Sequence, residues 1–181
     1  MRFAWDRGLD WEKERRKLLR LLRSEEENGG VRAIRRVAYL AVLYIQLSNG
    51  CRISEAAEAA IRFAQTGKRE VEVRVRKRRD NALRKVIIPR EIARYRPQIR
   101  TVVAEAGEDP HRLAERVRTW ASRRLGNTHA YRYAFIGYMA KRGVAAQLIA
   151  KITGHRKLDY VLHYTQKVKA EELLEEVVDG A

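Results

Sequence analysis

The chain has 181 residues, enough for one domain with a sizeable core, and carries 39 lysines and arginines against 23 aspartates and glutamates. Its formal net charge of +16 indicates a polyanionic partner, with nucleic acid ahead of a membrane surface. The single cysteine, Cys51, excludes an intrachain disulfide and a cysteine-based zinc site. No signal peptide is expected, and the longest uncharged apolar stretch, residues 37–47, is too short to span a bilayer. We therefore expect a soluble cytoplasmic protein, associated with the nucleoid and without a membrane partner.

Three helices are predicted in the first third of the chain. Residues 1–30 contain an amphipathic helix, whose apolar stripe lies among charged residues. It is followed by a loop in the acidic and glycine-rich residues 25–30. Residues 31–47 are apolar on nearly all sides after Arg36, which predicts a central, buried helix. A break at residues 48–50 precedes a third helix that runs to about Gln65.

Residues 66–89 form the one β-rich stretch. Three valines, Val71, Val73 and Val75, alternate with charged residues, which is the period of a half-buried strand. A turn at Asp80 and Asn81 and a returning strand over residues 85–88 complete an antiparallel hairpin. The tip of this hairpin is strongly basic.

The second half of the chain is predicted to be helical. Residues 89–106 form a helix that Pro97 kinks or splits, and residues 111–125 form another, with an arginine face open either to DNA or to water alone. A helix after Thr128 ends at Gly143, and a short one over residues 144–152 ends at Gly154 as its C-cap. A short amphipathic segment and a final helix over residues 169–179 follow. The predicted fold is mainly α with a small antiparallel β-hairpin or three-stranded sheet, an α+β class.

Four residues of this second half have the chemistry of a phosphate site. His129 and Arg132 are three apart and share a helix face, His155 directly follows the Gly154 cap, and Tyr164 comes nine residues later. A phenol can become a covalently linked phosphodiester, a guanidinium fork matches phosphate oxygens, and an imidazole can donate or move a proton.

These residues carry a resemblance to a known family. The pattern of His129-Ala-Tyr-Arg132, then Gly154-His155, then Tyr164-Thr165 resembles the tyrosine recombinase (phage-integrase) family, of archaeal or bacterial type. The stretch Gly50-Cys51-Arg52-Ile53-Ser54-Glu55 resembles the first-arginine box of the same family, and the resemblance covers residues 31–168. After that box the family often continues with Leu, Trp and an acidic residue, whereas residues 59–63 here are Ala-Ala-Ile-Arg-Phe.

The resemblance implies a set of catalytic roles. Tyr164 would attack the scissile phosphate and become joined to the 3′ phosphate, while Arg52 and Arg132 stabilise the charge on its non-bridging oxygens. Tyr160, one turn earlier, is the competing candidate for the nucleophile.

The remaining roles are proton transfer and a further phosphate contact. His155 would add a hydrogen bond to the phosphate, and His129 is the candidate base for the phenol. Lys77, in the hairpin, aligns best with the family's lysine and would protonate the leaving oxygen, with Lys85 as the alternative. No metal, nucleotide or other cofactor is implied, since the covalent link conserves the bond energy.

The implied partner is double-stranded DNA, and the implied activity is site-specific recombination or integration. The basic residues of the hairpin are predicted to contact the DNA backbone: Arg74, Arg76, Arg78 and Arg79. We expect self-assembly into a dimer or tetramer on DNA through the C-terminal helix, which packs either on its own domain or on a neighbour's. A type IB topoisomerase, a telomere resolvase and a DNA-binding protein without cleavage activity are the alternatives.

The expected organisation is a single catalytic domain over residues 1–181. It comprises an N-terminal helical arm (1–30), a catalytic core (31–168) and a C-terminal helix (169–181). A separate N-terminal core-binding domain, common in the family, is not expected in this sequence. The sequence leaves open whether the chain is naturally confined to a catalytic domain or is part of a longer protein.

Overall fold

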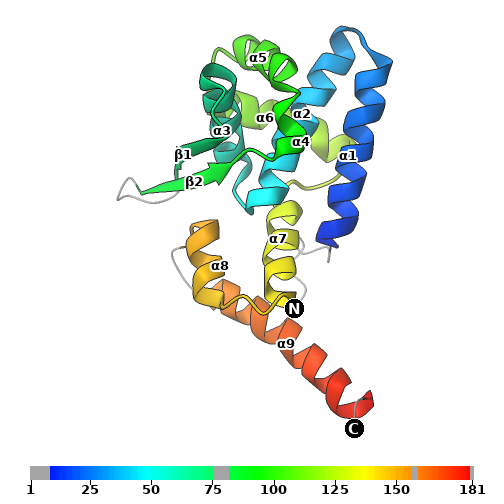
Figure 1. Cartoon of the computed structure of the whole chain (residues 1–181), viewed down its shortest axis with the longest axis vertical. Helices are drawn as coiled ribbons and strands as arrows, with labels where there is room; N and C mark the ends of the chain where they lie inside the picture. Colours follow the sequence, from blue (N-terminus) through cyan, green and yellow to red (C-terminus); the bar gives the residue numbers. More distant parts are fainter. Residues whose placement is uncertain (1–8, 76–81, 156–158, 180–181) are drawn as a thin grey trace.

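The computed structural model describes residues 9–75, 82–155 and 159–179, apart from the side chains of residues 160, 163–169, 171 and 172. In these ranges it has nine helices and two strands (Figure 1). In chain order they are α1 (Trp11–Asn28), α2 (Gly30–Asn49), α3 (Ile53–Thr66), β1 (Glu70–Arg74), β2 (Leu83–Ile87), α4 (Arg90–Ala93), α5 (Arg96–Glu105), α6 (Pro110–Arg124), α7 (His129–Lys141), α8 (Ala146–Thr153) and α9 (Asp159–Asp179).

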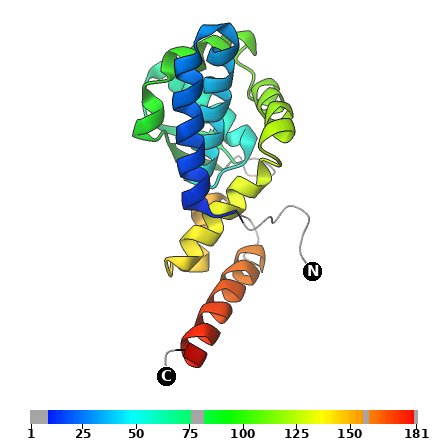
Figure 2. The same cartoon turned by 90° about the vertical axis from the view of Figure 1, so that its right-hand side faces the viewer.

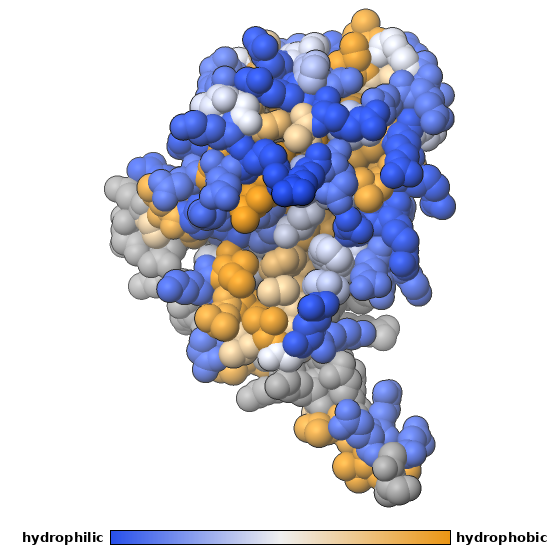
Figure 3. All heavy atoms as spheres, in the orientation of Figure 1, coloured by the Kyte–Doolittle hydropathy of each residue, from blue (hydrophilic) through white to orange (hydrophobic). Residues whose placement is uncertain are grey.

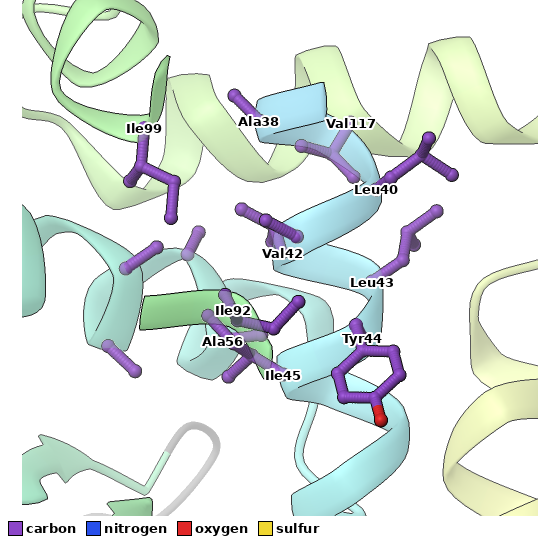
Figure 4. Packing of buried hydrophobic residues seen from close by; sticks show 14 of the residues in the cluster. Ala38, Leu40, Val42, Leu43, Tyr44, Ile45, Ala56, Ile92, Ile99 and Val117 are labelled. Carbon is purple, nitrogen blue, oxygen red and sulfur yellow. The ribbon is translucent and has the colours of Figure 1, made fainter. Parts of the chain in front are cut away.

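Helix α2 lies at the centre of the main core. It contacts α1, α3, α5, α6 and α7, and its residues from Val37 to Leu47 are almost all buried. Figure 4 draws side chains of α2, such as Leu40 and Ile45, together with Ile92 and Val117 of the surrounding elements. Each fully buried side chain of this size contributes roughly 1.5–3 kcal/mol relative to an exposed one. The prediction of a central, buried second helix is confirmed.

The hairpin is confirmed as an antiparallel pair, with Glu70 opposite Ile87 and Arg74 opposite Leu83. Inward-facing and outward-facing residues alternate along both strands, and the inward valines Val71 and Val73 are buried on the side where β1 contacts α3. The sheet has two strands among the described residues, so the three-stranded alternative is not found there.

Proline and glycine mark element ends as expected. The predicted helix over residues 89–106 is split into α4 and α5, and Pro97 lies in the first turn of α5, where its missing N–H costs nothing. Gly154 ends α8 in the left-handed conformation, with φ of 71°.

Two predicted boundaries are wrong. The acidic run that we expected in a loop belongs to the last turn of α1, because two of its carboxylates bind cations of neighbouring helices: Glu25 pairs with Arg36, and Glu26 pairs with Arg94. The expected short segment before Tyr164 and the separate final helix form one continuous helix, α9. No glycine or proline interrupts the sequence over that range.

A smaller cluster of buried residues joins α7, α8 and the start of α9, centred on Ile136, Ile149 and Val161. Beyond this cluster, α9 projects away from the rest of the molecule in both views (Figures 1 and 2). Its apolar residues there are 58–70% exposed: Leu173, Leu174, Val177 and Val178. On the face drawn in Figure 3, apolar surface also gathers over the region of α8, whose Leu148 and Ile152 are exposed. Among the described residues, no helix has the length and apolar character needed to cross a membrane.

Candidate active site

The side chain of Arg132 joins three parts of the chain that are distant in sequence. It extends from α7, and its Nη1 donates to the carbonyl of Gly50, after α2, and to that of Thr153, at the end of α8, each at 2.8 Å. The residue is 1% exposed. Gly50 has φ of 58°, and an added Cβ would collide with the ring of Phe135, so a glycine is required where this carbonyl turns toward Arg132.

His155 lies against the guanidinium of Arg132. The Arg132 Nη2 atom is 3.0 Å from Nε2 and 3.2 Å from Nδ1 of the imidazole. An atom so close to both ring nitrogens lies over the ring face, because in the ring plane it would collide with Cε1. The Arg132 Nη2 atom therefore contacts the imidazole from one face of the ring.

The electrostatic surroundings keep the imidazole of His155 neutral. Burial is the largest cause and repulsion from Arg132 the next, and together with Arg52, His129 and Arg84 they lower the pKa of His155 to about 3. The structure thus brings Arg132 and His155 into contact, and the charge of His129 acts on the same ring.

Arg52 lies at the N-terminus of α3, as predicted, and differs from Arg132 in its exposure. Its Nη1 donates to Oε1 of Glu55 at 3.0 Å, while its backbone N–H donates to Oε2 of the same carboxylate at 3.1 Å. The Arg52 side chain is 22% exposed, and that of Glu55 is fully buried. Arg52 is thus held at its base by Glu55 while part of the side chain faces solvent.

Arg84 of β2 is a member of this cluster that the sequence reasoning missed. Its Nη2 donates to the carbonyl of Asn49 at 2.8 Å, and its Nη1 to the carbonyl of Thr153 at 3.1 Å, with Oε2 of Glu55 at 3.4 Å. The side chain is 6% exposed. The available signal was the strand period, because extending the returning strand by one residue puts Arg84 on the same face as Val86 and Ile88.

The same alternation directs Lys85 to the other face of the hairpin. Its Nζ binds Oε2 of Glu70 at 2.8 Å, and its side chain is 61% exposed. Lys85, the alternative to Lys77 as proton donor, therefore points away from the cluster around Arg132. Arg74 is also on the outward face, and its backbone N–H donates to Glu58.

His129 is the first residue of α7. Its ring makes an edge contact with Tyr133, with centroids 5.3 Å apart, and its backbone N–H donates to Oδ1 of Asn127 at 2.9 Å. Repulsion from His129 is among the causes that lower the pKa of His155. The two histidines thus approach the same region from different elements.

Several predicted site residues lie outside the described part of the structure. These are the hairpin residues Arg76, Lys77, Arg78 and Arg79. Tyr164 and Tyr160 lie on α9, but their side chains are outside the description. Their roles remain predictions.

The described cluster holds more positive than negative charge. Arg52 and Arg84 both pair with the carboxylate of Glu55, whose charge also acts on Arg132. Burial, followed by repulsion from Arg52, lowers the pKa of Arg132 to about 10, so part of the cost of burying this cation is uncompensated. An anion with several oxygen acceptors, such as a phosphate, would relieve that repulsion and accept hydrogen bonds from the exposed part of Arg52.

Two curated relatives are similar to the chain. One, named Putative integrase ORF241, from Acidianus two-tailed virus, is 41% identical over 143 residues, which is 78% of this chain and 57% of the viral protein. The chain thus spans just over half of that relative's length. The other, Uncharacterized protein MJ0770 of Methanocaldococcus jannaschii, is 31% identical over an alignment that covers 97% of this chain and 90% of the relative.

The chain belongs to the family of the MJ0770 protein. Identity of this level over nearly the whole of both chains shows common family membership. No protein-family model and no solved structure gives a significant match.

Proposed function

We propose that the protein is a DNA strand transferase of the tyrosine recombinase type, which cleaves and rejoins double-stranded DNA as an integrase or site-specific recombinase. The observation that carries this proposal is the convergence of Arg52 at the start of α3, Arg132 of α7 and His155 after α8, with an excess of positive charge. The similarity to a viral protein named as a putative integrase supports it, as does the net charge of +16, which favours binding to a polyanion.

The first chemical step is attack by the Tyr164 oxygen on the scissile phosphorus. A bond forms between that oxygen and phosphorus, and the bond from phosphorus to the 5′ oxygen breaks. His129 takes the phenol proton, and Lys77 gives a proton to the leaving oxygen. Rejoining is the reverse, with a 5′ hydroxyl attacking the phosphotyrosine, so the bond energy is retained without ATP or a metal ion.

The two arginines divide the work of binding the phosphate. Arg52, with its exposed portion, meets the incoming non-bridging oxygens first. Arg132 is preorganised by the carbonyls of Gly50 and Thr153, which hold Nη1 and leave Nη2 beside His155 as the donor directed to the phosphate. Donors that are fixed before the substrate arrives cost little reorganisation in the transition state.

The proposed organisation treats residues 31–168 as the catalytic core of one domain. The exposed apolar residues at the end of α9 support the further proposal that this helix mediates assembly on DNA. Arg74 and the basic hairpin tip would bind the DNA backbone.

The decisive test uses a nicked suicide substrate, which traps the covalent intermediate for detection on a denaturing gel. The wild-type protein is expected to form a protein–DNA adduct. Tyr164→Phe should abolish it while retaining DNA binding, because only the hydroxyl is lost, and Tyr160→Phe serves as the matched control that still cleaves. If the wild-type protein binds DNA but forms no adduct, the proposal is wrong, and the protein is a DNA-binding protein without cleavage activity. Activity of Tyr164→Phe alongside an inactive Tyr160→Phe would reassign the nucleophile.

A further inference from the structure

Thr153 makes contacts to three of the charged or ionisable side chains of the cluster. Its carbonyl accepts from Nη1 of Arg132 at 2.8 Å and from Nη1 of Arg84 at 3.1 Å. Its hydroxyl oxygen is 2.7 Å from Nδ1 of His155 and 2.7 Å from the carbonyl oxygen of Ile149. The residue is fully buried. A threonine hydroxyl in this position was not among the residues that the sequence pointed to.

The geometry leaves one ring nitrogen of His155 for an incoming ligand. Nδ1 is occupied by the Thr153 hydroxyl, and the Arg132 guanidinium covers a face of the ring. Within the described part of the chain, Nε2 has only this facial contact with Arg132. An imidazole nitrogen donates or accepts a hydrogen bond in the plane of the ring. Thr153 uses this direction at Nδ1, which leaves the same direction at Nε2 for a ligand.

We infer that Thr153 is a positioning residue, which holds Nδ1 of His155 so that Nε2 is the nitrogen presented to the scissile phosphate. This inference rests on the proposed function for its ligand, but the Thr153–His155 contact can be tested without DNA.

The hydroxyl can hold the ring in either of two proton arrangements. A threonine hydroxyl has one proton, and two acceptors lie at the same distance, the Ile149 carbonyl and Nδ1 of His155. When the hydroxyl donates to Ile149, its oxygen accepts from Nδ1–H, and Nε2 carries no proton. When it donates to Nδ1, the ring proton is on Nε2, where it can be donated to a phosphate oxygen. A bound phosphate selects the second arrangement, because its oxygens are acceptors only.

The surrounding charges favour a ring that changes tautomer without gaining a proton. The charged or ionisable groups that face it are Arg132 and His129 of α7, Arg52 at the start of α3 and Arg84 of β2. All four oppose a positive charge on the imidazole. A hydroxyl that can both donate and accept suits a neutral ring in this setting better than a carboxylate partner would, because a carboxylate would stabilise the imidazolium.

The test compares two substitutions of this hydroxyl with a control substitution elsewhere in the chain. Thr153→Val removes the hydroxyl at nearly constant volume and leaves the backbone carbonyl that binds both arginines. Thr153→Ser retains a hydroxyl and should restore its effect. The matched control is Thr66→Val, which removes a hydroxyl bonded at 2.7 Å to the carbonyl four residues earlier, as in Thr153, but with no histidine.

The first measurement is ¹⁵N NMR of the imidazole nitrogens of His155, with and without target DNA. We expect a hydrogen-bonded Nδ1 in the free wild-type and Thr153→Ser proteins, altered Nδ1 and Nε2 shifts in Thr153→Val, and protonated Nε2 when DNA binds to the wild type. The second is the single-turnover cleavage rate. It should fall about 10–100-fold in Thr153→Val, by analogy with the loss of a partner that orients a metal-bound histidine, with little change in DNA affinity.

Unchanged His155 shifts and wild-type cleavage in a folded Thr153→Val protein would overturn the inference. Failure of Thr153→Ser to restore both readouts would overturn it as well. If Thr153→Val does not fold, Thr153→Ala, which adds no bulk, provides the same comparison with Thr153→Ser. A wild-type protein that forms no adduct would refute the proposed function, while the NMR of the DNA-free proteins still decides whether Thr153 orients the ring.

Discussion

Helices α2 and α9 bury their apolar residues to opposite degrees, although each is connected to the candidate site. The apolar residues of α2 are covered on nearly every side, and the turn that follows carries Gly50 and Arg52. Helix α9 carries Tyr164, and the apolar side chains of its second half remain exposed. The cluster proposed to bind phosphate is therefore built into the core. The proposed nucleophile, by contrast, is on a helix attached to the molecule mainly near its start.

The largest expected effects are those of replacing Arg132 or Arg52, and the two substitutions should differ in their effect on stability. Both Arg132→Ala and Arg52→Ala should lower single-turnover cleavage by about 10²–10³-fold or more, the usual loss for one transition-state donor. Arg132→Ala should destabilise the fold more than Arg52→Ala does, because it leaves the buried carbonyl of Gly50 without a donor, at about 1–3 kcal/mol, and removes one of the two arginine donors to the carbonyl of Thr153. Urea unfolding measures the difference. Equal stability of the two variants would contradict the distinction between a core-anchored and a surface arginine.

A second prediction concerns neighbouring residues on opposite faces of β2. Arg84→Met should destabilise the protein by roughly 3 kcal/mol, because it removes one partner of a buried ion pair and two carbonyl contacts. Lys85→Met, the matched control, breaks an exposed pair with Glu70 and should leave the free energy of unfolding almost unchanged, because surface ion pairs contribute little. Denaturant midpoints at equal slope provide the measurement. A similar loss from both variants would mean that burial of Arg84 does not determine its contribution.

The two residues also show what the sequence can and cannot predict. The alternation of valines and charges was enough to predict the hairpin, and the same period puts Arg84 on the inward face. The carbonyls of Asn49, Gly50 and Thr153 carry no such signal, since every residue has one and only the fold determines which turn faces an arginine. The role of the Thr153 hydroxyl could not be predicted from the sequence either, because it depends on the position of the His155 ring after α8.

For α9 the sequence contained a signal that was not used. The absence of glycine and proline between His155 and Asp179 is typical of one continuous helix, and the structure has one from Asp159. The expectations for Lys77, the hairpin arginines and the Tyr164 phenol concern side chains outside the described residues, so they remain predictions. The central helix, the split at Pro97 and the Gly154 cap were predictable, because glycine, proline and apolar periodicity act locally.

A third prediction follows from the neutral His155. Its pKa is about 3 in the folded protein, against an ordinary value near 6.5, so the unfolded chain binds the proton more readily between these values. The stability that this group contributes is complete above about pH 6.5 and declines as the pH falls toward 3, by at most about 1.4 kcal/mol per pH unit.

Urea unfolding of the wild type and of His155→Gln between pH 7 and pH 4 measures this contribution. The wild type should lose stability faster than His155→Gln as the pH falls, because the variant lacks the group that protonates only on unfolding. Parallel curves for the wild type and His155→Gln would show that the imidazole is not held neutral.

The smallest expected effect on stability is at the end of α9. Replacing Leu173, Leu174, Val177 and Val178 together by glutamine should change the monomer's free energy of unfolding by about 0.5 kcal/mol or less, since exposed side chains lose little on unfolding. Leu43→Ala in α2, the contrasting core variant, should cost about 2–5 kcal/mol. A large loss from the α9 variant would mean that these residues pack against their own chain in solution. If instead stability is kept, and DNA affinity with it, but strand exchange between two duplexes is impaired, the exposed residues act between protomers. In that case α9 would have two roles, because the helix that carries the proposed nucleophile would also hold the protomers together.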